Sequence, residues 1–500
     1  MKRMLVMACM AIVAGGGLLP AGAALAPAAA AAAETGGKLA ALMGRYHELG
    51  EFNGSVLVAR QGRILVNRGF GPADFEQKAA NGPDTRFLIG SLTKQFTAAM
   101  ILKLVETGRL SLDETLAEAL PYYRRDTGAK VTVRHLLEHS SGIPCFTRRM
   151  QDVQACPTAR EFVQKYCSGD LEFDPGSGFR YNNGGYVILG AVIEQAAGLS
   201  YEEALRRHIL SPLGMNDSGL GREGVPLPRA AKGYQRRGGQ VVAAGPVDPF
   251  LAFSAGGMYS TTRDMARWES AFYGDAVLSA ASRAILGSTP ARGYFCGQRF
   301  RRQAVGPNRA EREVIFHGGR ILGFNSLLLR IPQERIFIVL LNNTDSTRLE
   351  TMAAGLLDTL HGRIPRAPRR SLAEEFRVAL PTLGIAATLE KLRALRRQEG
   401  SLADPEPEEI QLNGFGYELL GQERRPEALA VFSFAVEEFP RSWNAYDSLA
   451  EAQATAGLRG QAVANYEKSL ELNPENRNAA EQAQKLRQAG AAGPQGRPRQ

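Results

Sequence analysis

Two side chains three residues apart have the types and the spacing needed for acyl transfer. Ser91 follows Gly90 at the start of a segment in which apolar residues recur with helical spacing as far as Gly108. Residues three apart share one face of a helix, so the Lys94 amine can reach the Ser91 hydroxyl. The helix N-terminus adds free N–H groups, and partial burial would lower the pKa of the lysine so that it could take the serine proton. Ser91 is the candidate nucleophile and Lys94 the candidate base.

This spacing is not specific on its own. A serine and a lysine three residues apart are expected by chance about once or twice in a chain of this length. The alternative interpretation is a serine that caps a helix and a lysine that lies in solvent. The assignment therefore depends on what the rest of the chain brings near the pair.

Strand-like segments near both ends of one region would position this helix. Two pairs of such segments indicate hairpins: 54–60 with 63–66, and 325–331 with 335–341. The pattern between the hairpins is mostly helical. These features predict a mixed α/β (α+β) fold, in which an antiparallel sheet built from both ends of the domain is flanked by helices and carries an inserted helical lobe.

Tyr181 and Asn183 lie on a bend that precedes an apolar helix, where side chains can point into a cleft. A tyrosine phenol beside a lysine ammonium can ionise more easily and shuttle protons, and an asparagine amide can donate to a substrate carbonyl. The alternative is a buried turn tyrosine with a structural role only.

His317, Gly318 and Gly319 follow a strand-like segment. Two glycines after a strand let a substrate approach the backbone closely, and the backbone amide of Arg320 becomes a candidate oxyanion donor together with that of Ser91. The alternative is that His317 is an ordinary residue of an edge strand.

His135 and His139 are four residues apart, a spacing that can hold a metal ion on a helix. The segment lacks the glutamate of an H-E-x-x-H pattern and any evident third ligand, so we expect packing roles for both and no metal site.

The composition is that of an ordinary globular protein, with 500 residues, 44% hydrophobic and 22% charged. The net charge of +9 could suggest nucleic acid, but the basic residues are scattered and form no stripe interleaved with aromatics. We therefore expect no nucleic-acid partner, and attraction to an anionic cell-envelope surface is the better interpretation of the charge.

The N-terminus has the features of a secretory signal peptide, predicted to span residues 1–33. Lys2 and Arg3 precede an apolar stretch and an alanine-rich region with a suitable cleavage position near Ala33. An uncleaved anchor is the alternative, but glycines and Pro20 interrupt the stretch before it reaches about 20 apolar residues. The mature chain is expected to be exported, to the periplasm or outside the cell, and to have no membrane span. Export permits one or two disulfides, in three full pairings, among Cys145, Cys156, Cys167 and Cys296.

Several motifs in the same order resemble the serine beta-lactamase-related family, which includes class C beta-lactamases, D-aminopeptidases, penicillin-binding peptidases and certain esterases. The resemblance predicts a hydrolase domain over 38–360. The motifs are Ser91-Leu-Thr-Lys94, the segment from His135 to Pro144, Tyr181-Asn-Asn183, Pro212-Leu-Gly-Met215, Ser254-Ala-Gly-Gly-Met258 and His317-Gly-Gly319.

The resemblance implies that Ser91 forms an acyl-enzyme and that Lys94 and Tyr181 share acid and base duty. It also implies that Asn183 positions the acyl side chain and that His317 begins the opposite wall of the cleft. Beta-lactamases of this branch usually carry Lys-Thr-Gly where this chain has His317-Gly-Gly319, and the lysine helps to recognise the antibiotic carboxylate. An esterase or a peptidase acting on D-amino-acid peptides is therefore expected in preference to a true beta-lactamase.

The composition changes after residue 360. Residues 361–370 form a basic, proline-containing linker, and 371–488 have a helical pattern in which Pro440 and Pro474, and Phe432 and Tyr466, are 34 residues apart. This period resembles tetratricopeptide repeats. The repeats could bind a protein partner or serve as a structural appendage. Residues 489–500 are expected to be disordered.

The sequence thus predicts an exported serine hydrolase that uses no metal or organic cofactor and acts on an ester, or on a D-amino-acid peptide or amide. The alternative from another class is a catalytically weak or inactive ligand-binding or sensor protein whose repeats recruit a partner.

Overall fold

The computed structural model describes residues 22–145, 156, 158–221, 227–237, 240–245, 249–306, 308–345, 348–399 and 406–491. Residues 1–21 of the predicted signal peptide and residues 492–500 of the predicted tail lie outside this part of the chain. No helix within it is both long enough and apolar enough to cross a bilayer.

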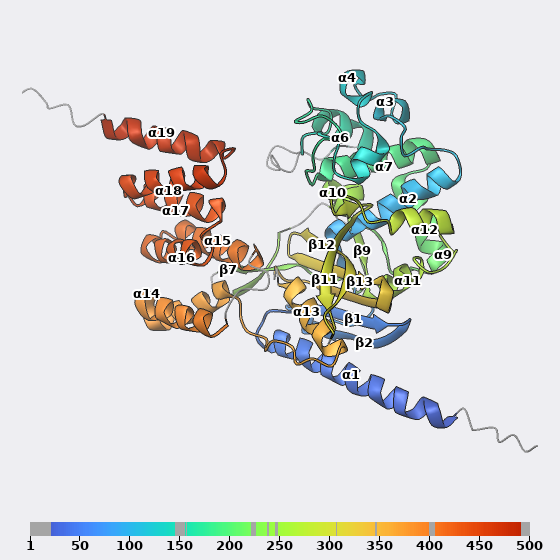
Figure 1. Cartoon of the computed structure of the whole chain (residues 1–500), viewed down its shortest axis with the longest axis horizontal. Helices are drawn as coiled ribbons and strands as arrows, with labels where there is room; N and C mark the ends of the chain where they lie inside the picture. The colour runs from blue at the N-terminus through green and yellow to red at the C-terminus, as the bar shows by residue number, and fades with distance from the viewer. Residues whose placement is uncertain are drawn as a thin grey trace, which may run out of the picture.

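A seven-stranded antiparallel sheet forms the centre of the predicted hydrolase domain, called the catalytic domain below (Figure 1). Its order is β10 (Tyr294–Phe295), β11 (Gln298–Val305), β12 (Ala310–Ile321), β13 (Phe324–Ile331), β14 (Ile336–Asn342), β1 (Gly54–Arg60) and β2 (Arg63–Phe70). Strand β1 pairs with β14, with Val58 opposite Ile338, so the two ends of the domain meet in one sheet. The predicted sheet and its two hairpins are confirmed.

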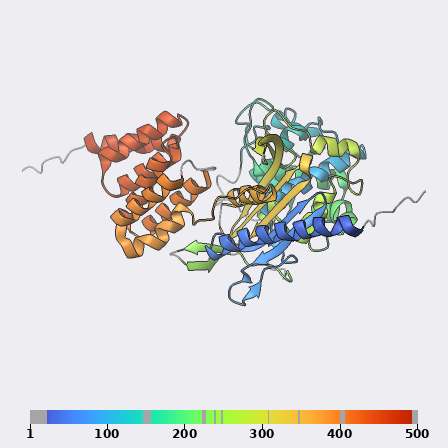
Figure 2. The ribbon, with the colours of Figure 1, turned by 60° about the horizontal axis from the view of Figure 1, so that its bottom comes forward.

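The two faces of the sheet carry different helices. The outer face is covered by α1 (Gly22–Glu48) and α13 (Leu349–Leu360), whose apolar side chains pack on it (Figure 2). Strands β13 and β14 are buried along their whole length, which accounts for their apolar runs 327–329 and 336–341. The inner face supports the helical lobe, so the predicted fold class is confirmed.

The lobe is built around α2 (Thr93–Glu106) and α7 (Asn183–Ala197), which pack against each other. Its other helices are α3 (Leu116–Ala119), α4 (Arg125–Gly128), α5 (Val133–Leu137), α6 (Ala159–Tyr166), α8 (Tyr201–Leu205), α9 (Ser211–Leu213), α10 (Pro249–Gly256), α11 (Thr262–Ser270) and α12 (Ala280–Leu286). The shorter strands are β3 (Pro72–Asp74), β4 (Ala79–Ala80), β5 (Phe87–Leu88), β6 (Gly219–Leu220), β7 (Tyr234–Arg237), β8 (Gln240–Ala243) and β9 (Met258–Ser260).

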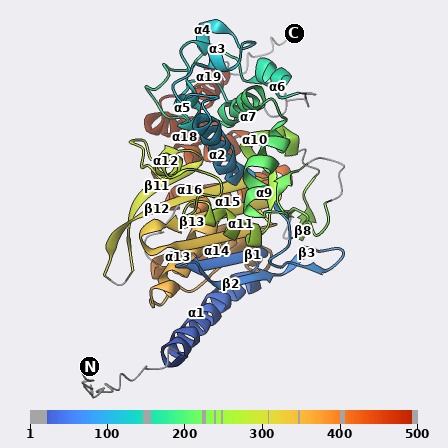
Figure 3. The same ribbon diagram turned by 90° about the vertical axis from the view of Figure 1, so that its right-hand side faces the viewer.

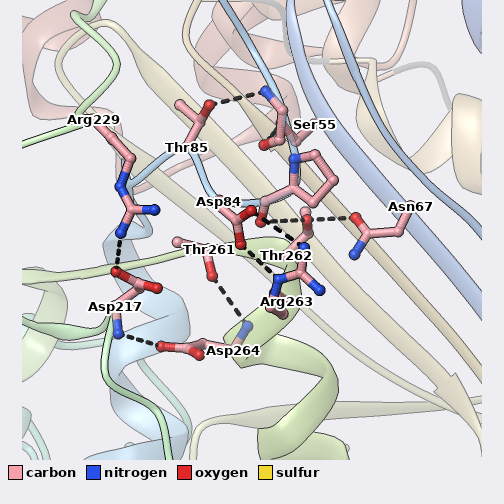
Figure 4. A network of polar contacts seen from close by, with 12 residues as sticks. Ser55, Asn67, Asp84, Thr85, Asp217, Arg229, Thr261, Thr262, Arg263 and Asp264 are labelled. Atoms are coloured by element: carbon pink, nitrogen blue, oxygen red, sulfur yellow. Dashed lines mark hydrogen bonds and ion pairs between the residues drawn. The ribbon is translucent and has the colours of Figure 1, made fainter.

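A polar network fixes the segment that leads into β5 (Figure 4). Arg263 of α11 pairs with Asp84, and Asp264 accepts a hydrogen bond from the backbone N–H of Asp217 at 2.8 Å. Asp217 in turn pairs with Arg229 at 2.7 Å. These contacts hold α11 and β9 against the segment from which β5 and then Ser91 follow.

The C-terminal helices form a separate block beside the catalytic domain (Figure 2), and in the view of Figure 3 they lie behind it. They are α14 (Leu372–Glu399), α15 (Glu406–Gly421), α16 (Arg425–Glu438), α17 (Trp443–Thr455), α18 (Arg459–Leu472) and α19 (Arg477–Ala491). Pro440 and Pro474 each follow the end of a helix, α16 and α18, and Phe432 and Tyr466 are both buried in these helices. The all-helical C-terminal region is confirmed and is consistent with the predicted repeats. Helix α19 continues to Ala491, into the segment predicted to be disordered.

A buried charged cluster attaches this block to the catalytic domain. Arg348 pairs with Glu408 at 3.3 Å and lies 3.9 Å from Glu51, and the backbone N–H of Ser371 donates to Glu51 at 2.7 Å. Burial raises the pKa of Glu51, while the neighbouring Arg348 opposes that shift. Arg236 of β7 also pairs with Glu374 of α14 at 2.8 Å.

Candidate active site

Ser91 lies in a single 3-10 turn (Gly90–Leu92) between β5 and α2, pressed against β12. Gly90 has φ +53°, and a Cβ at this position would lie 2.7 Å from the backbone nitrogen of Arg320. The Ser326 hydroxyl donates to the carbonyl of Ile89 at 2.7 Å and locks the turn onto the sheet. The absence of a side chain at Gly90 therefore lets the backbone of Ser91 come close to that of Arg320.

Lys94 lies one turn later and is completely buried. Its Nζ is 3.1 Å from Ser91 Oγ and donates to Asn183 Oδ1 and to the carbonyl oxygen of Ala255, both at 2.7 Å. None of these partners is a carboxylate, so nothing in direct contact offsets the loss of solvent. Burial accordingly lowers the pKa of Lys94 from 10.5 to about 7. The structure thus brings the predicted pair together with a lysine that titrates near neutrality.

Tyr181 donates a hydrogen bond to Ser91 Oγ at 2.8 Å. Its ring packs on that of His139, with the centroids 4.4 Å apart. Burial raises the pKa of Tyr181 above its usual value of 10. The expectation that the neighbouring lysine would make this phenol ionise more easily is wrong, because desolvation raises the pKa more than the hydrogen bond to Ser91 and the charge of Arg299 lower it. Tyr181 is a neutral donor in this site.

Asn183 is the first residue of α7, and Asn182, the N-cap, accepts a hydrogen bond from the backbone N–H of Gly185. The Asn183 side-chain oxygen is engaged by Lys94. Because the oxygen of the amide faces Lys94, its nitrogen, which carries both N–H donors, faces another direction. Asn183 lines the same cavity as Ser91. Its predicted role as a donor to substrate is compatible with this geometry.

His317 lies on β12 opposite the serine and is almost fully buried. Its Nε2 is 3.1 Å from the hydroxyl of Tyr294, and burial, reinforced by the charge of Lys94, lowers its pKa to about 3. His317 is therefore neutral at physiological pH. Gly319 is also required by close packing, since a Cβ there would lie 2.0 Å from the carbonyl oxygen of Ile89.

The candidate residues other than the buried Lys94 line one cavity of about 960 Å³. It is bounded by Ser91, Tyr181 and Asn183 on the side of the lobe and by His317 to Arg320 on β12. All eight residues singled out from the sequence are thus brought to this region: Ser91, Lys94, Tyr181, Asn183, His317, Gly318, Gly319 and Arg320.

Sequence reasoning missed several parts of this site. The carbonyl oxygen of Ala255 accepts a hydrogen bond from Lys94. Ala255 belongs to the Ser254-Ala-Gly-Gly-Met258 motif, so this motif could have identified it as part of the site. Arg299 and Tyr294 lie in none of the motifs identified in the sequence. The guanidinium of Arg299 lies 5.9 Å from the ring centroid of Tyr181, and only the pairing of β10, β11 and β12 brings it there.

His135 and His139 have separate local roles. His135 Nδ1 accepts a hydrogen bond from the backbone N–H of Thr132 at 3.2 Å, and His139 Nδ1 accepts one from that of Asn182 at 3.2 Å. In the part of the chain that the structure describes, no three His, Cys, Asp or Glu side chains are grouped as a metal ion would require. Cys167 and Cys296 are free thiols, and burial raises the pKa of both.

Comparison with known proteins identifies the family. A family model described as Beta-lactamase matches residues 38–361. Protein flp of Staphylococcus aureus (strain COL) is 26% identical over 304 residues, which are 58% of this chain and 59% of flp. The match thus spans only about three fifths of that curated relative.

Solved structures agree with this assignment. The octameric penicillin-binding protein homologue from Pyrococcus abyssi superposes with a TM-score of 0.56 at 28% identity, covering 66% of this chain and 78% of that one. The D-amino acid amidase from Ochrobactrum anthropi SV3 superposes with a TM-score of 0.56 at 25% identity, covering 66% of this chain and 97% of the amidase. With the fold, the matched segment and the solved relatives in agreement, the chain belongs to the beta-lactamase family of serine hydrolases.

Proposed function

We propose that this protein hydrolyses an ester, or a D-amino-acid peptide or amide, through an acyl-enzyme formed on Ser91. The observation that carries the proposal is the arrangement of Lys94, completely buried with a pKa of about 7, whose Nζ lies 3.1 Å from Ser91 Oγ. A serine hydroxyl needs a base that is unprotonated near neutral pH, and this lysine meets that requirement.

The hydrogen bonds around Lys94 can be formed by a neutral amine as well as by an ammonium. An uncharged amine has two hydrogens and one lone pair, and the oxygens of Asn183 and Ala255, each 2.7 Å away, accept the two hydrogens. The lone pair is then directed at Ser91 Oγ and accepts its proton. As the proton moves to Nζ, Oγ bonds to the substrate carbonyl carbon, and the resulting oxyanion lies between the backbone amides of Ser91 and Arg320.

Tyr181 completes the proton transfer. Its neutral hydroxyl donates to Ser91 Oγ in the free enzyme, and the raised pKa keeps that proton in place until a leaving group can accept it. When the bond to the leaving group breaks, Tyr181 protonates that group and recovers a proton from the Lys94 ammonium. Water then enters, Lys94 accepts its proton, and the acyl chain is released from the serine.

His317 supports a substrate other than a beta-lactam. A neutral imidazole offers no positive charge to the antibiotic carboxylate, and Gly318 has no hydroxyl to bind it. The likeness to a D-amino acid amidase supports an amide or ester of a D-amino acid as the substrate class. We further propose that the protein is exported after removal of residues 1–33, with the hydrolase domain at 38–360 and the helical region at 371–488.

The test is a turnover assay on the full mature chain with three probes: a D-alanyl peptide amide, p-nitrophenyl butyrate and a penicillin. We expect turnover of the amide or the ester, loss of that turnover in Ser91→Ala, and little turnover of the penicillin. Hydrolysis of none of the three, or equal rates in Ser91→Ala and wild type, would contradict the proposal. Faster hydrolysis of penicillin than of both other probes would reassign the enzyme as a beta-lactamase.

A further inference from the structure

The catalytic cavity continues onto the C-terminal helices. Ile410 of α15 lines the cavity that contains Ser91. It also lines a second cavity of about 860 Å³ between the catalytic domain and α14 and α15. Arg320 and Asn325 line both cavities as well. The space that begins at the serine therefore passes over the end of β12 and reaches α15.

One side of this groove is a free strand edge. The pairing of β11 with β12 ends at Phe316, opposite Arg299, while β12 continues to Ile321. On its other side, β12 stays paired with β13 over this stretch, with Gly318 opposite Leu327 and Arg320 opposite Asn325. Gly318 and Arg320 are exposed. A free edge of this kind can pair with the backbone of an extended chain.

Helix α15 forms the other side. Ile410, Gly414 and Tyr417 are spaced by four and three residues, so they share one helix face, and all three line the second cavity. Ile410 is 42% exposed, an uncommon state for a large apolar side chain facing a cavity. A Cβ built on Gly414 would meet no atom within 4 Å, so the groove is open at that point.

The groove beside the serine is strongly basic. Four arginines line it with a single acid: Arg299, Arg301, Arg302 and Arg320 against Glu350. Arg301 pairs with Glu350 at 3.0 Å, and Arg302 lies 3.7 Å from Glu311, which is outside the cavity. The side chains of Arg299 and Arg320 form no hydrogen bond or ion pair within the described ranges. In the second cavity, by contrast, Arg236 and Arg377 are paired with acids, with Glu374 and Glu418 respectively, at 2.8 Å in each case. The charge therefore favours anionic groups between the serine and Ile410.

We propose that α15 is part of the substrate-binding surface, and that the groove from Ser91 along β12 to Ile410 and Tyr417 binds the acyl portion of an extended peptide substrate that carries carboxylates. This inference rests on the proposed hydrolase function and adds its substrate class. The acyl portion is assigned because Tyr181, the donor to the leaving group, lies beside His317 at the near end of this stretch of β12, with the ring centroids 6.0 Å apart. The acyl portion of the substrate must then extend from Ser91 along β12 toward Arg320 and α15.

The test compares three p-nitrophenyl esters on the full mature chain: acetyl-D-alanine, and two pentapeptides that end in D-alanine after four glutamates or four glutamines. For wild type, we expect kcat/KM for the glutamate peptide to exceed that for the glutamine peptide by about tenfold at low salt, and the gap to narrow as salt is added. Because the three probes carry esters of similar reactivity, differences in kcat/KM among them report the effect of the acyl chain.

Two variants locate the effect. Ile410→Asp places a like charge beside the bound carboxylates, so the ratio of kcat/KM for the glutamate peptide to that for acetyl-D-alanine should fall about tenfold. Gly414→Phe fills the groove and should lower the ratio for both peptides. Val378→Asp is the matched control, because Val378 is an apolar residue of α14, 46% exposed, and lines neither cavity. In this control the ratio should stay at the wild-type value.

The inference fails if all three esters have kcat/KM values within about twofold of one another in wild type. It also fails if Ile410→Asp changes the ratio no more than Val378→Asp does. In either case hydrolysis of acetyl-D-alanine ester with an acyl group on Ser91 would leave the proposed function intact. Absence of acylation by all three esters would instead reject the proposed function itself.

Discussion

The pKa of Lys94 can be moved by one substitution, which gives a quantitative test of its role as the base. In a solvated lysine of pKa 10.5, roughly 0.03% of the molecules are neutral at pH 7, whereas a pKa of about 7 makes about half of them neutral. Burial thus increases the reactive form roughly a thousandfold. Because the neutral form is the base, acylation is fast above the pKa and is lost as the pH falls through it.

Asn183→Asp should move this pH dependence upward. The substitution replaces an amide oxygen 2.7 Å from Nζ with a carboxylate of nearly the same shape. An opposite charge at this distance raises a lysine pKa by about 1–3 units, so the neutral fraction at pH 7, and with it acylation, should fall about 5- to 500-fold. At about pH 8 to 10, the variant should reach the acylation rate that the wild type shows at pH 7. Asn216→Asp, at an exposed position outside the cavity, makes the same charge change and should leave the profile in place.

The assay is the rate of phosphonate labelling, followed by intact mass from pH 5 to pH 10 on all three proteins. For wild type, the rate should rise about tenfold per pH unit below about pH 7 and then level off. A wild-type profile that still rises at pH 10 would show a solvated lysine. Coincident profiles for Asn183→Asp and wild type would show that Lys94 is not the base.

Three further substitutions test other parts of the site. Tyr181→Phe keeps the ring packing but removes the donor to the serine, so kcat/KM should fall about 10²- to 10⁴-fold with little change in melting temperature; a normal rate would exclude Tyr181 from proton transfer. Gly90→Ala should lower the melting temperature and abolish labelling, because it combines φ +53° with a Cβ 2.7 Å from the Arg320 nitrogen. Gly62→Ala is its control, with φ +77° but no atom near the new Cβ, and equal losses in the two variants would contradict this steric account. His317→Asn should leave the pH of half-maximal labelling unchanged, because His317 has a pKa of about 3 and is already neutral; a shifted profile would show that it titrates.

Much of the site could be predicted because its residues lie in short motifs. Ser91 and Lys94 are one helical turn apart, so their contact follows from local geometry alone. The antiparallel sheet was also predictable, since the apolar segments that form β1, β2, β13 and β14 are bounded by turns.

The electrostatics of the site could not be predicted from motifs. The pKa of Lys94 depends on burial by Asn183 and Ala255, which are 89 and 161 residues away in sequence. The same holds for Tyr181, whose pKa was expected to fall and is instead raised by burial. Desolvation is set by the whole tertiary packing around a group, which no local pattern encodes.

The extension of the cleft onto α15 could not be predicted from the sequence for a similar reason. The sequence marks 361–370 as a linker and gives no sign of how the helices beyond it are oriented. Their placement follows from the buried cluster of Arg348, Glu51 and Glu408, whose members come from three separate segments. That cluster and the pair of Arg236 with Glu374 hold the block against the catalytic domain, and Ile410 of α15 lines the cavity of Ser91.

The most direct test of the central claim is peptide mapping of the phosphonate-labelled full chain at pH 8. The account predicts one adduct per chain, located on Ser91, absent in Ser91→Ala and formed far more slowly in Lys94→Ala. Labelling at another residue, or labelling of Lys94→Ala at the wild-type rate, would contradict an acyl-transfer mechanism in which Lys94 activates Ser91.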